Sequence, residues 1–337
     1  MDTIKSEIIS WPIQGSFRIS RSSLTHVDVV VVTISSGRHS GRGECRPYPR
    51  YGETPQSVCT QIKSLETDLS NLSRETLMTR LPSGAARNAV DCALWDLEAQ
   101  ITGKPVFELM NLSPPKSRET AFTLSLDTPD KMAEAAMKAQ EHRVLKIKIG
   151  GHDGLDCALA VLKARPEASL IIDANEALNT AELDRFQSVL NDKPIALIEQ
   201  PLAAGTELPK EKVGGRPIIC ADESLHTSGD LVRLWNEGYR AVNIKLDKAG
   251  GLTEAFKTAK EAKAMGFQIM LGCMVSSSLS MAPAMLLEGF ADIIDLDGAL
   301  LLAKDHLDGV AYEKGCVTPA PKSFWGYPRP NDIKRKP

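Results

Sequence analysis

The sequence has little that would favour a secreted, membrane-bound or nucleic-acid-binding protein. Its net charge is only −3 over 337 residues, which gives no electrostatic argument for binding nucleic acid or an acidic membrane surface. The apolar run VDVVVVTI is too short to span a bilayer and instead predicts a buried strand. The first residues, MDTIKSEIISWPIQG, lack a basic segment followed by an apolar one, so we expect no secretory signal.

The sequence also lacks the patterns of a disulfide framework, a zinc site or a phosphate loop. Its seven cysteines are an odd number without C-x-x-C spacing, and its six histidines form no ligand pair. A reducing, cytoplasmic setting is therefore the simpler expectation. The Gly-Gly pairs at 150–151 and 250–251 do not complete a phosphate-binding motif, so we expect them to turn the chain from strand into helix.

The chain has two parts with different patterns of predicted secondary structure. Residues 1–118 predict an α+β unit, whose last helical pattern, 83–103, should begin at a Ser cap and end at a glycine. Residues 119–309 contain eight strand-like segments separated by helical patterns, which is typical of parallel βα units. We therefore predict an α/β fold with a closed (β/α)₈ TIM barrel, the alternative being a doubly wound open sheet. The Pro-rich and aromatic segment 310–337 should return to pack on the first unit.

A polar residue stands near the end of each predicted barrel strand. Successive members of this set are 22 to 28 residues apart, which is one βα unit each time. The carboxyl ends of barrel strands form the active sites of such folds, so these groups should meet in one polar mouth. The members are Thr123, Lys148, Asp173, Glu199, Asp222, Lys245, Cys273 and the pair Asp295 and Asp297.

Three consecutive strands contribute the carboxylates of Asp173, Glu199 and Asp222. Converging carboxylates repel and raise one another's pKa unless a positive charge compensates them. Three oxygen ligands suit one Mg²⁺ ion, so the pattern predicts a magnesium site. The alternative is that each carboxylate caps a helix or pairs with a surface lysine.

Lysines lie on the strands that flank these carboxylates. Lys148 and Lys245 belong to the second and sixth predicted strands and should face each other across the barrel. Two amines beside a dication should have lowered pKa values, and two opposed bases can remove and return a proton on opposite faces of one carbon. Lys146 shares the face of Lys148 one layer deeper, where it would neutralise negative charge on a substrate. A buried salt bridge is the structural alternative for each lysine.

Such a site suits removal of a proton next to a carboxylate. The resulting enolate concentrates negative charge, which Mg²⁺ and Lys146 would stabilise where it develops.

These motifs resemble those of the enolase superfamily, in its muconate-lactonising subgroup. The resemblance rests on KIK (146–148), DAN (173–175), EQP (199–201), ADES (221–224) and NIKLDKAGG (243–251). It implies that residues 1–118 form a capping domain over the barrel mouth. It also implies that Asn175, Glu223 and Asp247 support the metal ligands.

The segment DLDG (295–298) resembles the Asp-x-Asp motif of dipeptide epimerases, whose acidic pair holds the free ammonium of the substrate. Thr123 and Cys273 match substrate-contacting positions of that group. The segments FRISR (17–21) and GECRPYPRYGE (43–53) resemble capping loops of enzymes that act on L-Ala-D/L-Glu, which implies this activity and a role in recycling cell-wall peptides. The candidates for binding an acidic side chain there are Arg18, Arg21, Arg46 and Arg50.

Other functions remain open at this point. The same scaffold could racemise N-acylamino acids, synthesise o-succinylbenzoate or carry out a cycloisomerisation. A Schiff-base aldolase using Lys148 or Lys245 is a further alternative, as is a binding protein without catalytic activity. The expected partner is a small-molecule dipeptide, with no nucleic acid and no membrane, and a homo-oligomer is compatible with the sequence.

Overall fold

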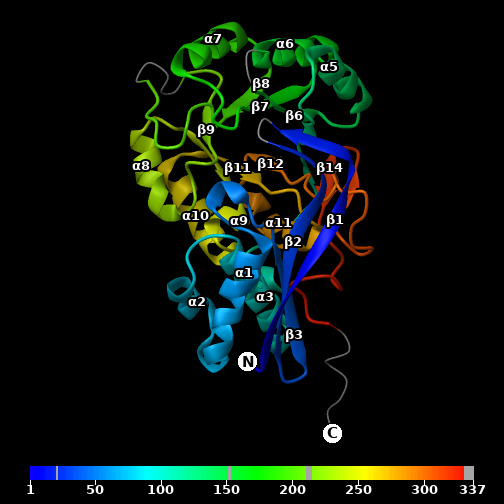
Figure 1. Cartoon of the computed structure of the whole chain (residues 1–337), viewed down its shortest axis with the longest axis vertical. Helices are drawn as coiled ribbons and strands as arrows, with labels where there is room; N and C mark the ends of the chain where they lie inside the picture. The colour runs from blue at the N-terminus through cyan, green and yellow to red at the C-terminus, as the bar shows by residue number, and fades with distance from the viewer. Residues whose placement is uncertain (20–21, 151–152, 210–214, 330–337) are drawn as a thin grey trace.

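The first part of the chain folds into an antiparallel sheet with helices packed against it (Figure 1). The computed structural model describes residues 1–19, 22–150, 153–209 and 215–329. The sheet has the order β1 (Thr3–Ile19), β2 (Ser22–Ser36) and β3 (His39–Cys45). The helical segments of this part are η1 (Pro49–Tyr51), α1 (Pro55–Lys63), η2 (Ser64–Asn71), α2 (Arg74–Arg80), α3 (Ala85–Thr102) and α4 (Val106–Leu109).

Helix α3 lies directly on this sheet because glycines let the two backbones approach. A Cβ atom at Gly41 would lie 2.2 Å from both the Ala93 carbonyl oxygen and the Leu97 nitrogen. The predicted Ser cap of this helix is wrong, since its N-cap residue is Gly84, with φ 139°. Glu53 Oε1 instead accepts a hydrogen bond from the first helical amide, that of Ala85, at 2.7 Å. The start of α3 is therefore fixed by a distant side chain.

The second part of the chain forms eight parallel strands in the sequential order β5 to β12, which confirms the predicted barrel-type fold. The two ends of this order meet, because the Ala121 amide donates to the Ile294 carbonyl at 2.8 Å. The strands are β5 (Phe122–Leu124), β6 (Val144–Lys148), β7 (Ser169–Asp173), β8 (Ile195–Glu199), β9 (Ile219–Ala221), β10 (Ala241–Ile244), β11 (Gln268–Gly272) and β12 (Ile293–Asp295).

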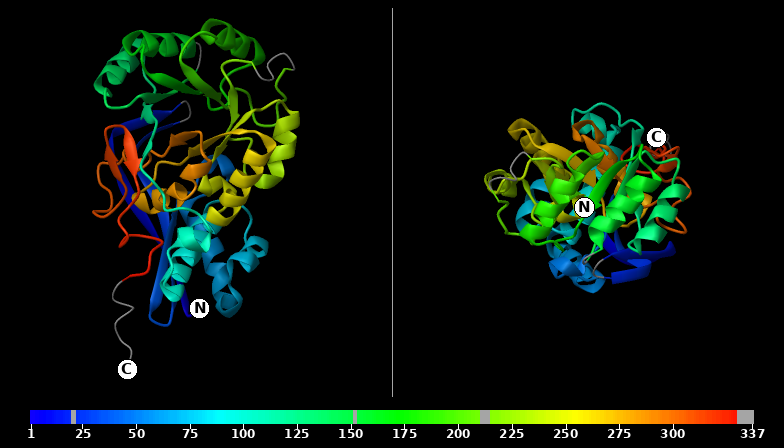
Figure 2. Two further views of the ribbon diagram at one scale, coloured as in Figure 1. Left: turned by 180° about the vertical axis from the view of Figure 1, so that it is seen from behind. Right: turned by 90° about the horizontal axis from the view of Figure 1, so that it is seen from above.

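Helices cover the outside of these strands, as the views from behind and above also show (Figure 2). No helix in the described ranges is long and apolar enough to cross a membrane. The helical segments of this part are α5 (Pro129–Lys138), α6 (Gly154–Ala164), α7 (Thr180–Leu190), η4 (Ser228–Asp230), α8 (Leu231–Asn236), α9 (Leu246–Ala249), α10 (Leu252–Met265), α11 (Ser278–Met285) and η5 (Glu288–Phe290).

A layer of small and apolar side chains fills the barrel interior below the polar residues. Its fully buried members form one cluster: Ala121, Ile171, Leu197, Cys220, Ala241 and Met270. Side chains two residues apart on a strand share a face, so the next layer toward the carboxyl ends holds the residues two positions later. These include Thr123, Asp173, Glu199, Asp222 and Asn243. The alternation of the strands thus places a polar layer on an apolar floor.

The C-terminal segment runs back along the first part of the chain. Strands β13 (Ala311–Glu313) and β14 (Cys316–Thr318) form a hairpin that pairs with β4 (Arg118–Glu119). Further on, Trp325 Nε1 donates to the Arg42 carbonyl at 2.8 Å. The Gly326 amide donates to Asp96 Oδ1 at 2.9 Å, which joins the segment to helix α3.

Candidate active site

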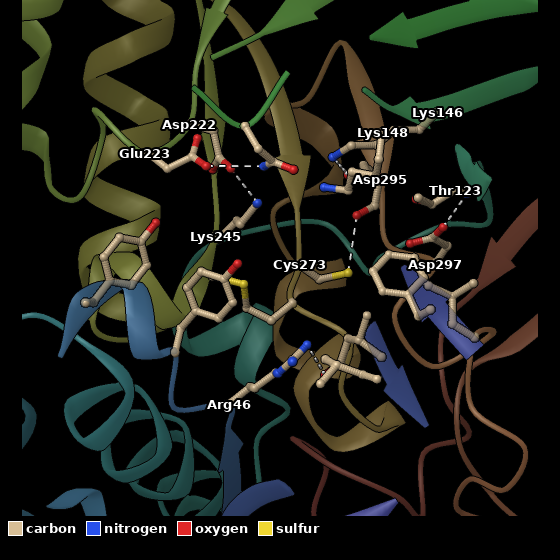
Figure 3. Close-up of a pocket in the computed structure, with 18 residues that line it drawn as sticks. Arg46, Thr123, Lys146, Lys148, Asp222, Glu223, Lys245, Cys273, Asp295 and Asp297 are labelled. Atoms are coloured by element: carbon tan, nitrogen blue, oxygen red, sulfur yellow. Dashed lines mark hydrogen bonds and ion pairs between the residues drawn. The ribbon is translucent and has the colours of Figure 1, made fainter. Parts of the chain in front are cut away.

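A cavity lies at the carboxyl ends of the barrel strands and is bounded on its other side by the first part of the chain (Figure 3). The aromatic and apolar side chains of Phe17, Leu24, Tyr48 and Tyr51 contribute that boundary. Most of the residues predicted from the sequence also line the cavity: Arg46, Thr123, Lys146, Lys148, Asn175, Asp222, Glu223, Lys245, Cys273, Asp295 and Asp297.

The carboxylates of Asp173 and Glu199 lie deeper, each 0% exposed, beneath the lysines. Lys146 Nζ lies 2.7 Å from Glu199 Oε2 and 3.2 Å from Asp173 Oδ2. Lys148 Nζ donates to Asp173 Oδ2, and Lys245 Nζ donates to Asp222 Oδ2 at 2.7 Å. The three acidic groups are therefore gathered around lysine ammonium groups.

The second oxygen of each carboxylate is held by a different neighbour. The Asn175 amide donates to Asp173 Oδ1 at 3.1 Å, and Asn243 Nδ2 donates to Glu199 Oε1 at 2.7 Å. Lys248 Nζ donates to Asp222 Oδ1. Each carboxylate thus has one fixed oxygen and one oxygen directed at a lysine of the cavity.

Burial and charge act in opposite directions on these groups. Burial alone would raise the pKa of Asp222, but Lys245 and Lys248 hold it well below its usual range. Burial and then the Asp173 carboxylate raise the pKa of Glu199 to about 8. The lowered lysine pKa values that we expected are those of amines beside a dication, and they stay a prediction. Burial lowers the pKa of Lys245, but the Asp222 and Glu199 carboxylates outweigh it and raise that pKa well above its usual value.

Asp173, Glu199 and Asp222 fit a hard divalent cation by their chemistry, since carboxylate oxygens are the ligands that Mg²⁺ prefers. Glu199 Oε2 is buried and lies 2.7 Å from Lys146 Nζ, so an ammonium group contacts the oxygen that would bind a cation. As the side chains lie, no three acidic, His or Cys side chains within the described ranges surround a common point closely enough to hold an ion. A cation would therefore replace contacts that lysine ammonium groups now make.

Lys148 and Lys245 approach the cavity from opposed strands. Lys148 ends β6 and Lys245 follows β10, so that β7, β8 and β9 separate them in the sheet order. Both side chains line the cavity, and Figure 3 shows them on different sides of it. The space between two amines is where one carbon could be reached from both faces.

Asp295 and Asp297 form an acidic wall of the cavity beside Lys146. Lys146 Nζ donates to Asp295 Oδ2 at 2.7 Å, whereas the buried Asp295 Oδ1 accepts no hydrogen bond from the described residues. The Thr123 amide donates to Asp297 Oδ2 at 2.7 Å. Burial and then the Asp295 carboxylate raise the pKa of Asp297 to about 6. This wall therefore has acceptor capacity that a cationic substrate group could use.

The candidate arginines lie in different environments. Arg46 lines the cavity, with Nη1 3.5 Å from the Val275 carbonyl oxygen and its guanidinium 5.9 Å from the Tyr48 ring centroid. Arg50 forms two hydrogen bonds with Glu176, at 3.0 and 2.8 Å, outside the cavity lining. Arg18 is exposed, and Arg21 lies outside the described residues. Among the described arginines, only Arg46 is placed to meet a substrate in this cavity.

The residues expected to support the metal ligands have different hydrogen-bond partners. Asn175 contacts Asp173 through its backbone amide, and its side chain donates to Glu223 Oε1 at 3.2 Å. Asp247 instead faces the first part of the chain, where it accepts hydrogen bonds from the Arg46 amide at 3.0 Å and from Asn88 Nδ2 at 2.9 Å. It links the two parts of the chain beside the cavity.

Sequence reasoning missed several residues of this site. Gln200 has a left-handed backbone, with φ 36°, and its Oε1 accepts from the amides of Asp222 and Ser224, both at 3.0 Å. Tyr48 and Tyr51 line the cavity, and Lys248 holds Asp222. Two signals could have identified these residues. Gln200 is a polar residue directly after Glu199, and Lys248 lies one helical turn after Lys245.

Comparison with known proteins gives matches along nearly the whole chain. Residues 3–111 match the N-terminal domain of mandelate racemase/muconate lactonizing enzymes, and residues 130–322 match the enolase C-terminal domain-like family. An L-Ala-D/L-Glu epimerase of Escherichia coli strain K12 is 42% identical over 94% of this chain and 99% of its own length. An N-acetyl-D-glutamate racemase of a Pseudoalteromonas species is 42% identical over 88% of this chain and 95% of its own.

A solved structure shows a similar fold. It is an enolase family member from Agrobacterium tumefaciens with homology to dipeptide epimerases, and it holds sodium and L-Ala-L-Glu. Its TM-score is 0.91 at 44% identity, covering 96% of this chain and 99% of that one.

Proposed function

The chain belongs to the mandelate racemase/muconate lactonizing enzyme family of the enolase superfamily and is an isomerase of amino acid derivatives, and we propose that it epimerises L-Ala-D/L-Glu dipeptides. The observation that carries this proposal is the pair of lysines, Lys148 and Lys245, on opposed strands of one cavity. The isomerase assignment removes the Schiff-base aldolase and the non-catalytic binding protein from consideration.

The two lysines would exchange the α-proton of the second residue. One lysine, as a neutral amine, removes the proton from one face, and the other, as an ammonium, delivers a proton to the opposite face, so that the stereocentre is inverted. The contacts of Lys148 with Asp173 and of Lys245 with Asp222 place both amines beside the carboxylates, and a bound cation would replace these contacts. In the reverse direction the two lysines exchange roles.

Negative charge develops on the substrate carboxylate when the α-proton leaves. A Mg²⁺ ion held by Asp173, Glu199 and Asp222 would supply Lewis-acid stabilisation of that charge. Lys146, 3% exposed and in contact with Glu199 and Asp295, adds a fixed positive charge at the same depth.

The remaining residues would orient the dipeptide. Asp295 and Asp297 would bind the N-terminal ammonium. Asp295 Oδ1, which accepts no hydrogen bond from the described residues, would be an acceptor, with Thr123 and Cys273 beside it. Arg46 would bind the side-chain carboxylate of the second residue. An enzyme with this specificity would act in recycling of cell-wall peptides.

The test is incubation with Mg²⁺ and a dipeptide library in D₂O, followed by mass spectrometry. We expect a gain of one mass unit in L-Ala-L-Glu and L-Ala-D-Glu, and chelation of the metal should abolish it. If dipeptides with an apolar second residue exchanged as fast as those with glutamate, the specificity would be contradicted. Absence of exchange in every dipeptide would contradict the function.

A second candidate is the racemisation of N-acetylglutamate, because one relative of that name is 42% identical to this chain. This substrate has the same side-chain carboxylate and the same α-proton, but acetylation removes its ammonium. The acidic wall of Asp295 and Asp297 therefore favours the dipeptide. Turnover of N-acetyl-L-glutamate with a higher kcat/KM than L-Ala-L-Glu would reverse this order.

A further inference from the structure

Lys248 is a buried amine for which the proposed reaction has no use. It lies in the short helix α9, one turn after Lys245, and is 1% exposed. The lining of the cavity includes Lys245 but not Lys248. Burying an ammonium group costs free energy unless each of its N–H donors has a hydrogen-bond partner, so the contacts of Lys248 indicate its role.

All three donors of this ammonium have oxygen partners. Lys248 Nζ donates to Asp222 Oδ1, to the Asp222 carbonyl oxygen, and to the Asn243 carbonyl oxygen at 3.1 Å. The other carboxylate oxygen, Asp222 Oδ2, accepts from Lys245 at 2.7 Å. One carboxylate is thus held between two lysines, of which only one faces the cavity.

The same amine connects two of the three carboxylates. Asn243, whose carbonyl oxygen binds Lys248, donates through Nδ2 to Glu199 Oε1 at 2.7 Å. Lys248 therefore ties the end of β9 to β10. It binds Asp222 Oδ1 directly and is linked through Asn243 to Glu199 Oε1.

We propose that Lys248 is a positioning residue of the cation site, which holds Asp222 in the rotamer that turns Oδ2 into the cavity. This inference rests on the proposed function only in that the three carboxylates bind a divalent cation. Groups that fix the orientation of a metal ligand typically change metal affinity or activity by about 10- to 100-fold when they are removed.

A matched control separates positioning from a purely structural salt bridge. Arg87 is another buried cation, 7% exposed, and it donates to the carbonyls of Ala249 at 2.7 Å and Gly250 at 3.0 Å, at the end of the same helix α9. In the described structure, its side chain donates hydrogen bonds to backbone carbonyls. Removing Arg87 should lower the stability of this region without reorienting Asp222.

The experiment measures binding of Mn²⁺ alone by electron paramagnetic resonance, with circular dichroism to establish folding. In Lys248→Met we expect the Kd for Mn²⁺ to rise by about 10-fold or more. We expect Arg87→Met to keep the wild-type Kd even if its unfolding midpoint falls, and Lys248→Arg to recover part of the lost affinity. A wild-type Kd in Lys248→Met would overturn the proposal.

Lys248→Gln, which keeps two N–H donors without the charge, is the second variant if the Met variant does not fold. Weak Mn²⁺ binding by a folded Gln variant supports the proposal. If neither neutral variant folds whereas Arg87→Met does, the role of Lys248 is structural and the proposal is overturned. The readout needs no dipeptide, so failure of dipeptide turnover with normal Mn²⁺ binding would count against the proposed function alone.

Discussion

Replacing Arg46 by methionine should remove the preference for an acidic second residue. Arg46 is the described arginine that lines the cavity, and its guanidinium lies against Tyr48 and the Val275 carbonyl. Methionine keeps the length and the apolar contacts of the side chain but has neither charge nor donors. The backbone amide of Arg46 would still donate to Asp247, so this link between the two parts of the chain should survive.

The expected fall in kcat/KM follows from the loss of one charged hydrogen-bonding partner in a largely desolvated site. Such a bond contributes about 1.5–3 kcal/mol. At about 1.4 kcal/mol for each factor of ten, this corresponds to a fall in kcat/KM of about 10- to 150-fold. The fall should apply to L-Ala-L-Glu, whereas L-Ala-L-Met, with no side-chain charge, should change little.

The assay is therefore the ratio of kcat/KM for L-Ala-L-Glu to that for L-Ala-L-Met, measured for each variant at fixed pH and Mg²⁺. A ratio is insensitive to partial misfolding, because both substrates use the same active protein. Arg50→Met is the matched control, since Arg50 pairs with Glu176 outside the cavity lining and should leave the ratio unchanged. An unchanged ratio in Arg46→Met would refute the assignment of this arginine to the substrate side chain.

Three other predictions follow from single groups. Burial and the neighbouring Asp295 carboxylate raise the pKa of Asp297 to about 6, so protonation below that pH should remove its charge and raise KM for the dipeptide. In steady-state kinetics, Asp297→Asn should have a high KM that does not depend on pH in this range. Burial raises the pKa of Glu44 to about 8 in the folded chain, from its usual value of 4.5. The folded state therefore binds more protons between these values, and the free energy of unfolding should fall by up to a few kcal/mol as pH rises through that window. Chemical denaturation at several pH values should show a smaller fall for Glu44→Gln, and equal slopes would contradict the burial of charge. Gly41→Ala places a Cβ atom 2.2 Å from the Ala93 carbonyl oxygen and should cost about 1–3 kcal/mol or more of unfolding free energy, whereas Gly229→Ala, with its nearest atom at 3.5 Å, should cost much less.

The architecture was accessible from the sequence because strand periodicity and unit length are local properties. Parallel βα units repeat at regular spacing, so Asp173, Glu199 and Asp222 had to end neighbouring strands. Alternation along each strand then predicted that Lys146 and Lys148 point inward together.

The features that sequence spacing does not determine depend on contacts between distant segments. The N-cap of α3 is a glycine because Glu53, about thirty residues earlier in the chain, supplies the acceptor that the predicted Ser cap would have given. Asp247 follows Lys245 closely, yet its carboxylate faces Asn88 across the boundary between the two parts of the chain. Sequence spacing fixes the strand on which a residue lies, but the rotamer and the partner depend on the packing of both parts.

The most direct test of the central claim is deuterium exchange by the two single-lysine variants, Lys148→Met and Lys245→Met. Each variant, with Mg²⁺ in D₂O, is given L-Ala-L-Glu and L-Ala-D-Glu separately, and α-proton exchange is followed by NMR. Opposed bases predict that neither variant epimerises its substrate, and that each exchanges the α-proton of a different epimer. Exchange of the same epimer by both variants, or epimerisation at the wild-type rate by either, would contradict a two-base reaction across this cavity.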